Sequence, residues 1–282
     1  AITLVMVIIV SIAAVIMGSA MMFGNVFGAI KKYRCTILQF VPAQVAQILA
    51  RAEKLLIEVA PQIRLVSVGS AVIPEHDKER LRELLPKVRL FNDFGSTEAI
   101  GSAYFEWSAF PPKPNCVGTP SLHSNILFIG DDGKVIVDSN RNNPGIIATE
   151  GGTIMSGYLN EPELTKEVMC DGRVLSADIG YFGDDGMIYI LGRKDDIIVS
   201  GANKISPAEV EDAVLNINGV RECACVPKPD AVMGQMPALF VVWESEGMQA
   251  SDLSEVLRKR LDKFKVPRPE NIYEVDKLPR TA

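Results

Sequence analysis

The pattern of apolar and polar residues between positions 36 and 59 predicts a strand followed by a helix. Residues 36–41 (TILQFV) form a short apolar run that is typical of a buried strand. Pro42 follows at a position that suits the first turn of a helix. Apolar residues then recur at helical spacing and predict a helix to about Val59. Its inward face is Val45, Ile48, Leu49, Ala52, Leu55 and Leu56.

The next forty residues repeat this order of strand and helix. Residues 64–74 (RLVSVGSAVIP) predict an apolar strand that runs into a loop of small residues, and residues 87–99 (KVRLFNDFGSTEA) predict a strand and then a loop. The helix expected between them ends at Pro86. Its apolar side is formed by Leu81, Leu84 and Leu85. Alternating strands and helices predict a parallel sheet with helices packed on it.

The first thirty residues carry no charged side chain, which favours a buried helix followed by a buried strand. Their unbroken apolar part ends at Met17, and a helix of about 17 residues is only about 25 Å long, short of the roughly 30 Å hydrocarbon core of a membrane. Gly18 and Gly24 then interrupt the pattern. We therefore expect no stable membrane insertion, and an anchor formed by residues 1–17 is the alternative.

From about Cys116 the chain changes to short alternating runs separated by turn residues. Asp-Gly between apolar runs is a strong hairpin signal, so this part is expected to be mostly antiparallel strand. The turn signals are DDG (131–133), NNPG (142–145), CDG (170–172) and DDG (184–186).

A third pattern begins near residue 195. Ser206-Pro207-Ala208-Glu209 predicts a capping box that opens a helix to about Leu215. VRECACVP and PALFVVWE predict strands, Ser251 is expected to cap a second helix, and ENIYEVDKLPRTA predicts a strand entering a loop.

Together these patterns predict an α/β fold with two domains. The large domain covers residues 1–194, with a parallel α/β layer over 1–115 and a mostly antiparallel β subdomain over 116–194. A small α+β domain follows over residues 195–282.

Composition narrows the classes of function. The 282 residues have a net charge of −6 and no basic stripe, so nucleic-acid binding is not expected. With two histidines, His76 and His123, neither a histidine-based metal site nor a Ser-His-Asp triad is expected, and both are predicted on the surface or in loops. The cysteines lack a CxxC pair, which predicts free thiols in a reducing cytoplasm. They are Cys35, Cys116, Cys170, Cys223 and Cys225.

The segment NDFGSTEA lies at the carboxyl end of a predicted parallel strand, where open α/β sheets bind ligands. Gly95 would let the backbone approach a ligand closely, and Phe94 offers an apolar plane for a base. Ser96 and Thr97 carry hydroxyl groups for a phosphate, and Glu98 is a hard oxygen ligand suited to Mg²⁺. The same residues also suit the start of a helix, so composition alone leaves both interpretations open.

Five segments, taken in order, resemble the AMP-forming acyl-CoA ligases. They are RLVSVGSAVIP, NDFGSTEA, TIMSGYLNEPELT, SADIGYFGDDGMIYILGRKDDIIVSGANKISPAEVE and the closing LPRTA. These ligases belong to the adenylate-forming superfamily, with carrier-protein-loading adenylation domains and luciferases. The resemblance implies an enzyme that uses ATP and Mg²⁺ to activate a carboxylic acid as acyl-AMP, releases pyrophosphate, and forms a thioester with coenzyme A (CoA). It also implies a cytoplasmic location and a role in fatty acid metabolism, and it is compatible with a homodimer.

The resemblance implies a set of residues that bind ATP or AMP. In such enzymes the loop matching Gly69-Ser70-Ala71 lines the adenine and acyl pocket. Asn92 matches a contact to the adenine amino group, and Phe94 matches an aromatic residue, usually tyrosine, that packs on the base. The full set is Gly69, Ser70, Ala71, Asn92, Asp93, Phe94, Gly95, Ser96, Thr97, Asp178 and Arg193.

Four residues have more specific roles by resemblance. Thr97 matches the hydroxyl that binds the AMP phosphate, and Glu98 matches the Mg²⁺ ligand. Asp178 matches the carboxylate that takes both ribose hydroxyls, a bidentate task suited to its two oxygens. It lies in the tripeptide SAD, where the family usually has TGD. Arg193 matches a second contact to ribose and phosphate.

The border of the predicted small domain carries four consecutive charges, Arg193, Lys194, Asp195 and Asp196. Asp195 falls on the position that acts as a hinge in this family, where the small domain presents one face to each of two half-reactions. Hinges commonly lie at the ends of elements, and charged neighbours keep this one solvated. Gly201 and Ala202 match small residues that border the pantetheine tunnel.

Two parts of the family's catalytic machinery have no counterpart among the 282 residues. They are a Ser/Thr/Gly-rich phosphate loop, normally upstream, and a lysine that normally follows the PRT segment. Each binds charge that develops in the reaction, and losing one such contact can cost about 10²–10³ in rate. We therefore expect the chain to be a portion of a longer protein and to be inactive by itself.

Three alternatives stay open. A carrier-protein-loading adenylation domain is the nearest, although SGANKISPAEVE resembles the CoA ligases more closely. A luciferase-like oxygenase is the second. From a different class, a non-catalytic relative that binds a nucleotide or an acyl group is the third. The sequence does not predict which carboxylic acid is used, and its pocket is expected partly near residues 64–73 and 91–105.

Overall fold

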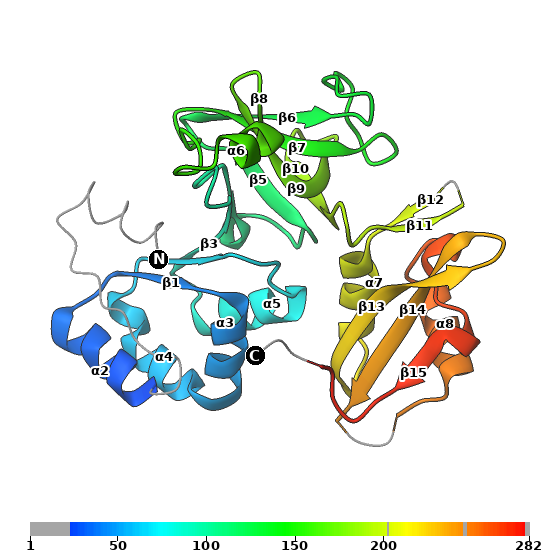
Figure 1. The fold of residues 1–282 in the computed structure, drawn as a ribbon. Coiled ribbons are helices and arrows are strands. Elements are labelled where there is room, and N and C mark those ends of the chain that lie inside the picture. Colours follow the sequence, from blue (N-terminus) through cyan, green and yellow to red (C-terminus); the bar gives the residue numbers. More distant parts are fainter. Residues whose placement is uncertain (1–22, 202, 245–246, 280–282) are drawn as a thin grey trace. The chain divides into compact units, whose positions relative to one another are not determined.

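The computed structural model describes residues 23–201, 203–244 and 247–279, and the chain divides into two compact units (Figure 1). Unit 1 comprises the described residues up to Ser176 together with Tyr181–Tyr189. Unit 2 comprises Ala177–Gly180 and the described residues from Ile190 onward. The alternative of a membrane anchor at residues 1–17 falls outside the described residues. Among the described helices, none has the length and apolar character needed to span a bilayer.

The predicted parallel layer of unit 1 is confirmed. Its strands are β1 (Ile37–Phe40), β2 (Leu65–Gly69) and β3 (Arg89–Phe94), and each pair is parallel. The helices are α2 (Phe23–Tyr33), α3 (Pro42–Arg51), α4 (Glu53–Val59) and α5 (Glu75–Leu84), with a short 3₁₀ turn η1 (Ala60–Gln62) after α4. Figure 1 shows the helices gathered along one side of these strands. One core unites the two layers and includes Phe27, Val45, Ile48, Leu56, Val66, Val68, Leu81 and Leu90.

Two expectations about these helices are corrected. A buried strand was expected in the later part of the first thirty residues, but residues 23–30 are helical. Gly24 and Gly28 face open space in this helix, while Phe27 and Ile30 are buried, so the glycines mark its outer side and not a break. The helix expected from residue 42 to 59 is interrupted at Ala52, whose backbone (φ −139°, ψ 16°) is not helical. Neither glycine nor proline lies at that break.

The antiparallel part predicted from residue 116 is also confirmed, but it begins earlier, because β4 lies at Ala103–Glu106 and pairs antiparallel with β3. Its elements are β4 (Ala103–Glu106), η2 (Trp107–Ala109), β5 (Cys116–Pro120), β6 (Ser124–Ile129), β7 (Gly145–Gly151), α6 (Pro162–Val168), β8 (Met169–Cys170), β9 (Arg173–Phe182) and β10 (Ile188–Arg193). The sheet runs β1-β2-β3-β4-β5-β10-β9-β7-β6, and β8 pairs with β9. In the β8–β9 hairpin, Asp171 and Gly172 both have positive φ, as the Asp-Gly signal predicts.

Unit 2 contains a second sheet. Its elements are β11 (Ile198–Ser200), β12 (Asn203–Ile205), α7 (Pro207–Leu215), β13 (Val220–Asp230), β14 (Gly234–Trp243), α8 (Ala250–Arg258), η3 (Lys263–Lys265), η4 (Pro269–Asn271) and β15 (Ile272–Glu274). The order is β12-β11-β14-β13, and β15 pairs in parallel with β14. Both helices pack on the sheet through a core that includes Ile198, Val210, Val214, Leu239, Leu253 and Leu257.

The start of α7 agrees with the prediction in its N-cap, Ser206, and in Pro207 at the first helical turn, and the start of α8 differs from its prediction. Ser206 Oγ accepts a hydrogen bond from the backbone N–H of Glu209 at 3.2 Å, as an N-cap should. For α8 the N-cap is Gln249, and Ser251 lies inside the helix. The backbone N–H of Leu253 donates to the carbonyl of Gln249 at 3.0 Å, which starts the helix one turn before its first buried leucine.

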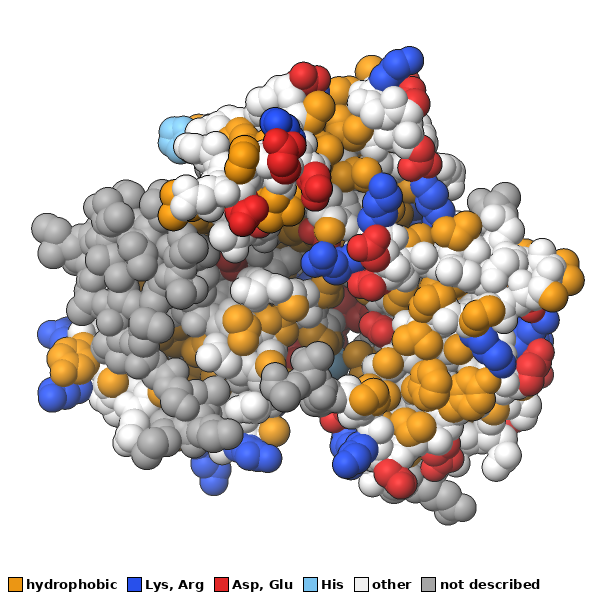
Figure 2. All heavy atoms as spheres, in the orientation of Figure 1, with side chains coloured by type: hydrophobic (Ala, Val, Ile, Leu, Met, Phe, Trp, Pro, Cys, Tyr) orange, Lys and Arg blue, Asp and Glu red, His pale blue; other side chains and the backbone are white. Residues whose placement is uncertain are grey.

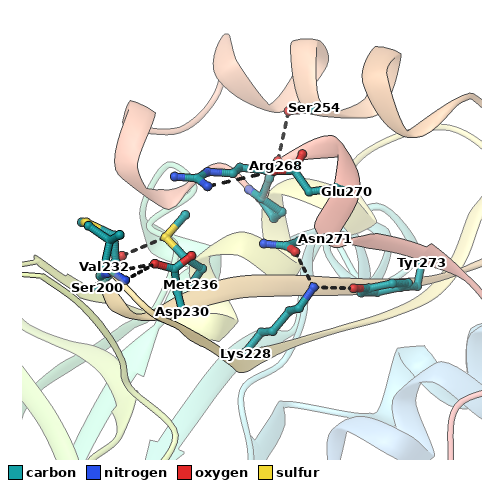
Figure 3. Close-up of polar contacts among 12 residues, drawn as sticks. Ser200, Lys228, Asp230, Val232, Met236, Ser254, Arg268, Glu270, Asn271 and Tyr273 are labelled. Carbon is teal, nitrogen blue, oxygen red and sulfur yellow. Dashed lines mark hydrogen bonds and ion pairs between the residues drawn. The ribbon is translucent and has the colours of Figure 1, made fainter.

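Polar side chains tie the elements of unit 2 to one another (Figure 3). Lys228 Nζ on β13 donates to Asn271 Oδ1 at 2.8 Å and to the Tyr273 hydroxyl at 2.9 Å. Ser254 Oγ on α8 donates to the carbonyl of Pro267 at 3.0 Å. These polar groups are therefore satisfied within the unit itself.

The surface mixes charges of both signs. On the face drawn in Figure 2, basic and acidic side chains are interspersed. The described residues include ion pairs at the surface: Arg80 contacts Glu53 at 2.8 Å and Glu83 at 2.7 Å.

Candidate functional site

The carboxyl ends of β2 and β3 carry the first group of predicted nucleotide-binding residues. The parallel register pairs Gly69 with Asp93, so the loops that follow the two strands leave the sheet side by side. The carboxylate of Asp93 accepts a hydrogen bond from Ser67 Oγ at 2.7 Å and another from Gln39 Nε2 at 3.4 Å. This is the edge at which parallel α/β sheets bind ligands.

The loop after β2 has a constrained backbone. A Cβ on Gly69 would lie 2.4 Å from Asp93 Oδ1, so any other residue here would displace that carboxylate. Ser70 has a φ of 74°, in the left-handed region that side chains rarely occupy. Ser70 and Ala71 are exposed at this edge. The backbone here is thus held in a conformation that costs about 1–3 kcal/mol, a feature that clusters at ligand sites.

The loop after β3 is a turn closed by its own side chain. Ser96 Oγ accepts hydrogen bonds from the N–H groups of Glu98 at 3.2 Å and Ala99 at 3.1 Å. The helix start that composition also permitted is wrong, because this loop leads into β4 and not into a helix. A Cβ on Gly95 would lie 2.7 Å from the nitrogen of Gly101, so the loop's own closure already requires this glycine. Thr97 is exposed at its tip.

The two residues of β3 predicted to contact adenine differ in exposure. Asn92 is buried and Phe94 is half-buried. Neither has a contact that tests the predicted role toward adenine, and both roles remain predictions.

Glu98 is the carboxylate of this loop, and a neighbouring side chain holds it. The hydroxyl of Tyr158 donates to Glu98 Oε1 at 2.7 Å. This hydrogen bond is the largest influence on the Glu98 carboxyl and lowers its pKa below the ordinary value, although burial acts in the opposite direction. The same bond raises the pKa of Tyr158. Glu98 is therefore ionised at neutral pH and holds one oxygen in a fixed position.

These contacts fit the predicted Mg²⁺ role of Glu98. Mg²⁺ in nucleotide sites is usually held by one or two carboxylates together with phosphate oxygens and water. Within the described ranges, no group of three or more His, Cys, Asp or Glu side chains is arranged to hold a metal by itself. An ionised, half-buried Glu98 suits the partial ligand set that a nucleotide-bound ion needs.

A second group of predicted residues belongs to unit 2. Asp178 on β9 is half-buried, and burial is the largest influence on its carboxyl, raising its pKa. The charge of Arg193 acts to lower that pKa, and the charge of Asp196 acts to raise it. The N–H of Lys194 donates to the carbonyl of Ala177 at 2.6 Å, which ties β9 to the segment after β10.

The four consecutive charges form a turn. The carbonyl of Arg193 accepts hydrogen bonds from the N–H groups of Asp196 at 3.0 Å and Ile197 at 3.1 Å. Asp195 lies in the middle of the turn, and all four charged residues are exposed. The turn joins the end of β10 to β11, and the hinge role of Asp195 remains a prediction.

Of the two residues predicted at the pantetheine tunnel, only one can be described. Gly201 follows β11 with a φ of 59°, and its N–H donates to the carbonyl of Met233 at 2.8 Å. A Cβ there would lie 2.9 Å from Met233 Cε. Ala202 falls outside the described residues.

The structure also adds residues that the sequence did not indicate. Tyr158 donates a hydrogen bond to Glu98, which lies 60 positions away along the chain. Ser67 and Gln39 donate to Asp93, which lies 26 and 54 positions away. Tyr158 lies in a segment quoted for the family resemblance, but its spacing from Glu98 carries no signal of contact. Both histidines match their prediction, since His76 and His123 are exposed, and the five cysteines are free.

Comparison with protein families gives two matches. A family described as AMP-binding enzyme matches residues 2–159. The AMP-binding enzyme C-terminal domain matches residues 209–282.

Individual relatives are similar over most of this chain. The indoleacetate–CoA ligase of Aromatoleum aromaticum is 29% identical over 259 residues, which cover 91% of this chain and 49% of that ligase. The solved amide bond synthetase of Marinactinospora thermotolerans has a TM-score of 0.80 and 26% identity, covering 91% of this chain and 51% of that one. O-succinylbenzoate coenzyme A synthetase of Bacillus subtilis, solved with ATP and magnesium ion, has a TM-score of 0.76 and 25% identity, covering 93% and 52%. The chain spans about half the length of the relatives it matches.

Proposed function

The chain belongs to the AMP-binding enzyme family, and from this premise we propose that the protein activates a carboxylic acid with ATP and passes the acyl group to CoA. In the first half-reaction the substrate carboxylate attacks the α-phosphate of Mg·ATP and expels pyrophosphate. In the second, a CoA thiolate attacks the acyl carbonyl of the mixed anhydride and AMP leaves.

One observation carries the proposal: β2 and β3 end side by side at Gly69 and Asp93. The loops within RLVSVGSAVIP and NDFGSTEA therefore lie at the same edge of the parallel sheet. That is the edge at which such folds bind ligands. The names of the relatives support the reaction, because the indoleacetate enzyme is a CoA ligase.

The residues of unit 1 would bind the phosphates. The exposed hydroxyl of Thr97 would donate to the AMP phosphate, and the ionised Glu98 would hold the metal ion that accompanies ATP. A bound Mg²⁺ would neutralise negative charge on the phosphates. Fixed groups of this kind act because they face charge that develops during the reaction.

The residues of unit 2 would bind the ribose. The two carboxylate oxygens of Asp178 would accept hydrogen bonds from both ribose hydroxyls, and Arg193 would contact ribose and phosphate. Asp178 suits this task because it is half-buried, so hydroxyl donors would replace water that burial has removed.

We assign Asp195 as the hinge between half-reactions, supported by its place in an exposed turn at the end of β10. Asp195→Pro would fix φ at this position and restrict the residue before it, which limits the turn. We expect it to reduce thioester formation more than adenylate formation, while Asp195→Ala affects both only slightly. Separate assays of pyrophosphate release and thioester yield would check this, and equal losses in both steps would contradict the hinge.

The function itself is tested by incubating the full protein with Mg·ATP and a panel of carboxylic acids. We expect pyrophosphate release that requires one class of acid, and a CoA thioester when CoA is added. Adenylate formation without a CoA product would instead support transfer to a carrier-protein thiol or to an amine. No acid-dependent pyrophosphate release with any acid would contradict the proposal.

The proposed location is the cytoplasm. The five free cysteines support it, because a reducing compartment keeps thiols unpaired.

A further inference from the structure

The hydrogen bond between Tyr158 and Glu98 belongs to a contact between two loops. The N–H of Ile100 donates to the carbonyl of Thr153 at 3.1 Å, and the N–H of Met155 donates to the carbonyl of Glu98 at 2.7 Å. These backbone bonds hold the loops together. The hydroxyl of Tyr158 then reaches Glu98 Oε1 at 2.7 Å.

Tyr158 is itself held by α6. Thr165 Oγ1 accepts a hydrogen bond from the N–H of Tyr158 at 2.9 Å and donates to the carbonyl of Glu161 at 2.8 Å. Gly157, just before the tyrosine, has a φ of 141°, and a Cβ there would lie 3.1 Å from Thr165 Cγ2. One threonine therefore fixes the backbone from which the Tyr158 side chain extends.

We propose that Tyr158 is a positioning residue for Glu98 and that Thr165 fixes Tyr158 in turn. This inference rests on the proposed function, in which Glu98 is a ligand of the ATP-bound metal ion. A glutamate side chain loses conformational entropy when it is ordered. A hydrogen bond to Oε1 orders the carboxylate before the metal binds.

The contact has little part in filling the core. Tyr158 and Glu98 are both only half-buried. The change Tyr158→Phe keeps the ring and removes only the hydroxyl, so it separates orientation of the carboxylate from packing. Losing a partner that orients a metal ligand typically costs about 10- to 100-fold in metal affinity or activity.

The test measures ATP affinity by isothermal titration calorimetry, in the full protein, once with Mg²⁺ and once with EDTA. We expect Tyr158→Phe to bind ATP about 10- to 100-fold more weakly than wild type in Mg²⁺, and equally well in EDTA. Tyr189→Phe is the matched control, because the Tyr189 hydroxyl also donates to a carboxylate, that of Asp185, at 2.9 Å in the same unit. It should bind as wild type does in both conditions.

Thr165 gives a second pair of variants. Thr165→Val removes the hydroxyl and should cause a smaller loss, again only with Mg²⁺, while Thr165→Ser keeps the hydroxyl and should restore wild-type affinity. Circular dichroism reports whether each variant folds. If Tyr158→Phe does not fold, Thr165→Val and Thr165→Ser decide whether Tyr158 positions Glu98.

The outcomes separate this inference from the proposed function. If wild-type binding depends on Mg²⁺ and Tyr158→Phe matches wild type, the positioning role is overturned and the function stands. Equal weakening in Mg²⁺ and EDTA also overturns it, because that pattern indicates a general structural defect. If wild-type binding does not depend on Mg²⁺, the metal role of Glu98 fails and this inference fails with it.

Discussion

The two carboxylates assigned to the nucleotide, Glu98 in unit 1 and Asp178 in unit 2, are held in opposite ways. Glu98 accepts a hydrogen bond from Tyr158, and that bond outweighs burial, so its pKa lies below the ordinary value. For Asp178, burial is the largest influence and outweighs the nearby charge of Arg193, so its pKa lies above the ordinary value. One carboxylate is stabilised in its charged form and the other is not.

The contacts of Glu98 indicate that this carboxylate is oriented before the ligand binds. Glu98 already has a fixed partner, as does Lys228 of unit 2, whose Nζ donates to Asn271 and Tyr273 (Figure 3). Asp178 carries a desolvation cost that Arg193 only partly offsets. A ligand with two hydroxyl donors would reduce that cost, and the two hydroxyls of a ribose offer this.

The largest expected effect comes from Glu98→Gln, which keeps the shape of the side chain and removes its charge. We expect a loss of about 10²-fold or more in Mg²⁺-dependent pyrophosphate release, since even a residue that only orients a metal ligand costs 10- to 100-fold. A titration of activity with Mg²⁺ checks this. Normal Mg²⁺ dependence of the variant's activity would contradict the role of Glu98 as a metal ligand.

A smaller effect is expected for Asp178→Ala. A hydrogen bond to a charged group contributes about 1.5–3 kcal/mol, and in the variant water would replace part of what the two ribose hydroxyls lose, so the net loss of ATP affinity should be near that of one such bond, roughly 10- to 100-fold. Adenine, which lacks the ribose, should bind to the variant and to wild type equally. Calorimetry with both ligands measures the two effects, and an unchanged ATP affinity would rule out the ribose contact.

The smallest expected effect is on stability, through the pH dependence of Asp178→Asn. Because the folded state raises the pKa of Asp178 above its unfolded value, its contribution to stability is present below the unfolded pKa and is lost as pH rises through the folded pKa. The variant has no charge to bury, so its advantage over wild type should grow as pH rises from about 3 to 7. Urea unfolding at several pH values measures this. A constant difference across the range would mean that burial of the charge is not its cause.

Much of the fold could be predicted from the sequence, because the dominant signals are local. The apolar run at 64–74 became β2, and the Asp-Gly pair at 171–172 became a hairpin turn. The break at Ala52 and the start of α8 before Ser251 could not be located. Both depend on which helical face packs on the core, and no turn residue marks either position.

The candidate site was less predictable. The loop that holds Glu98 could be found from its residue types and the family resemblance, but the partner that orders it could not. Tyr158 reaches Glu98 only because backbone pairing brings together loops that are 60 residues apart. Gly95 shows the reverse case, since its position was predicted for ligand approach while the closure of the loop already requires it.

The most direct test of the nucleotide-binding roles proposed for Glu98 and Asp178 is amide hydrogen exchange of the full protein with and without Mg·ATP. The account predicts that residues 92–99 and residues 176–196 both become protected at the same ATP concentration, and that Asp178→Ala shifts both transitions together. Protection of only one segment, or of neither, would contradict it.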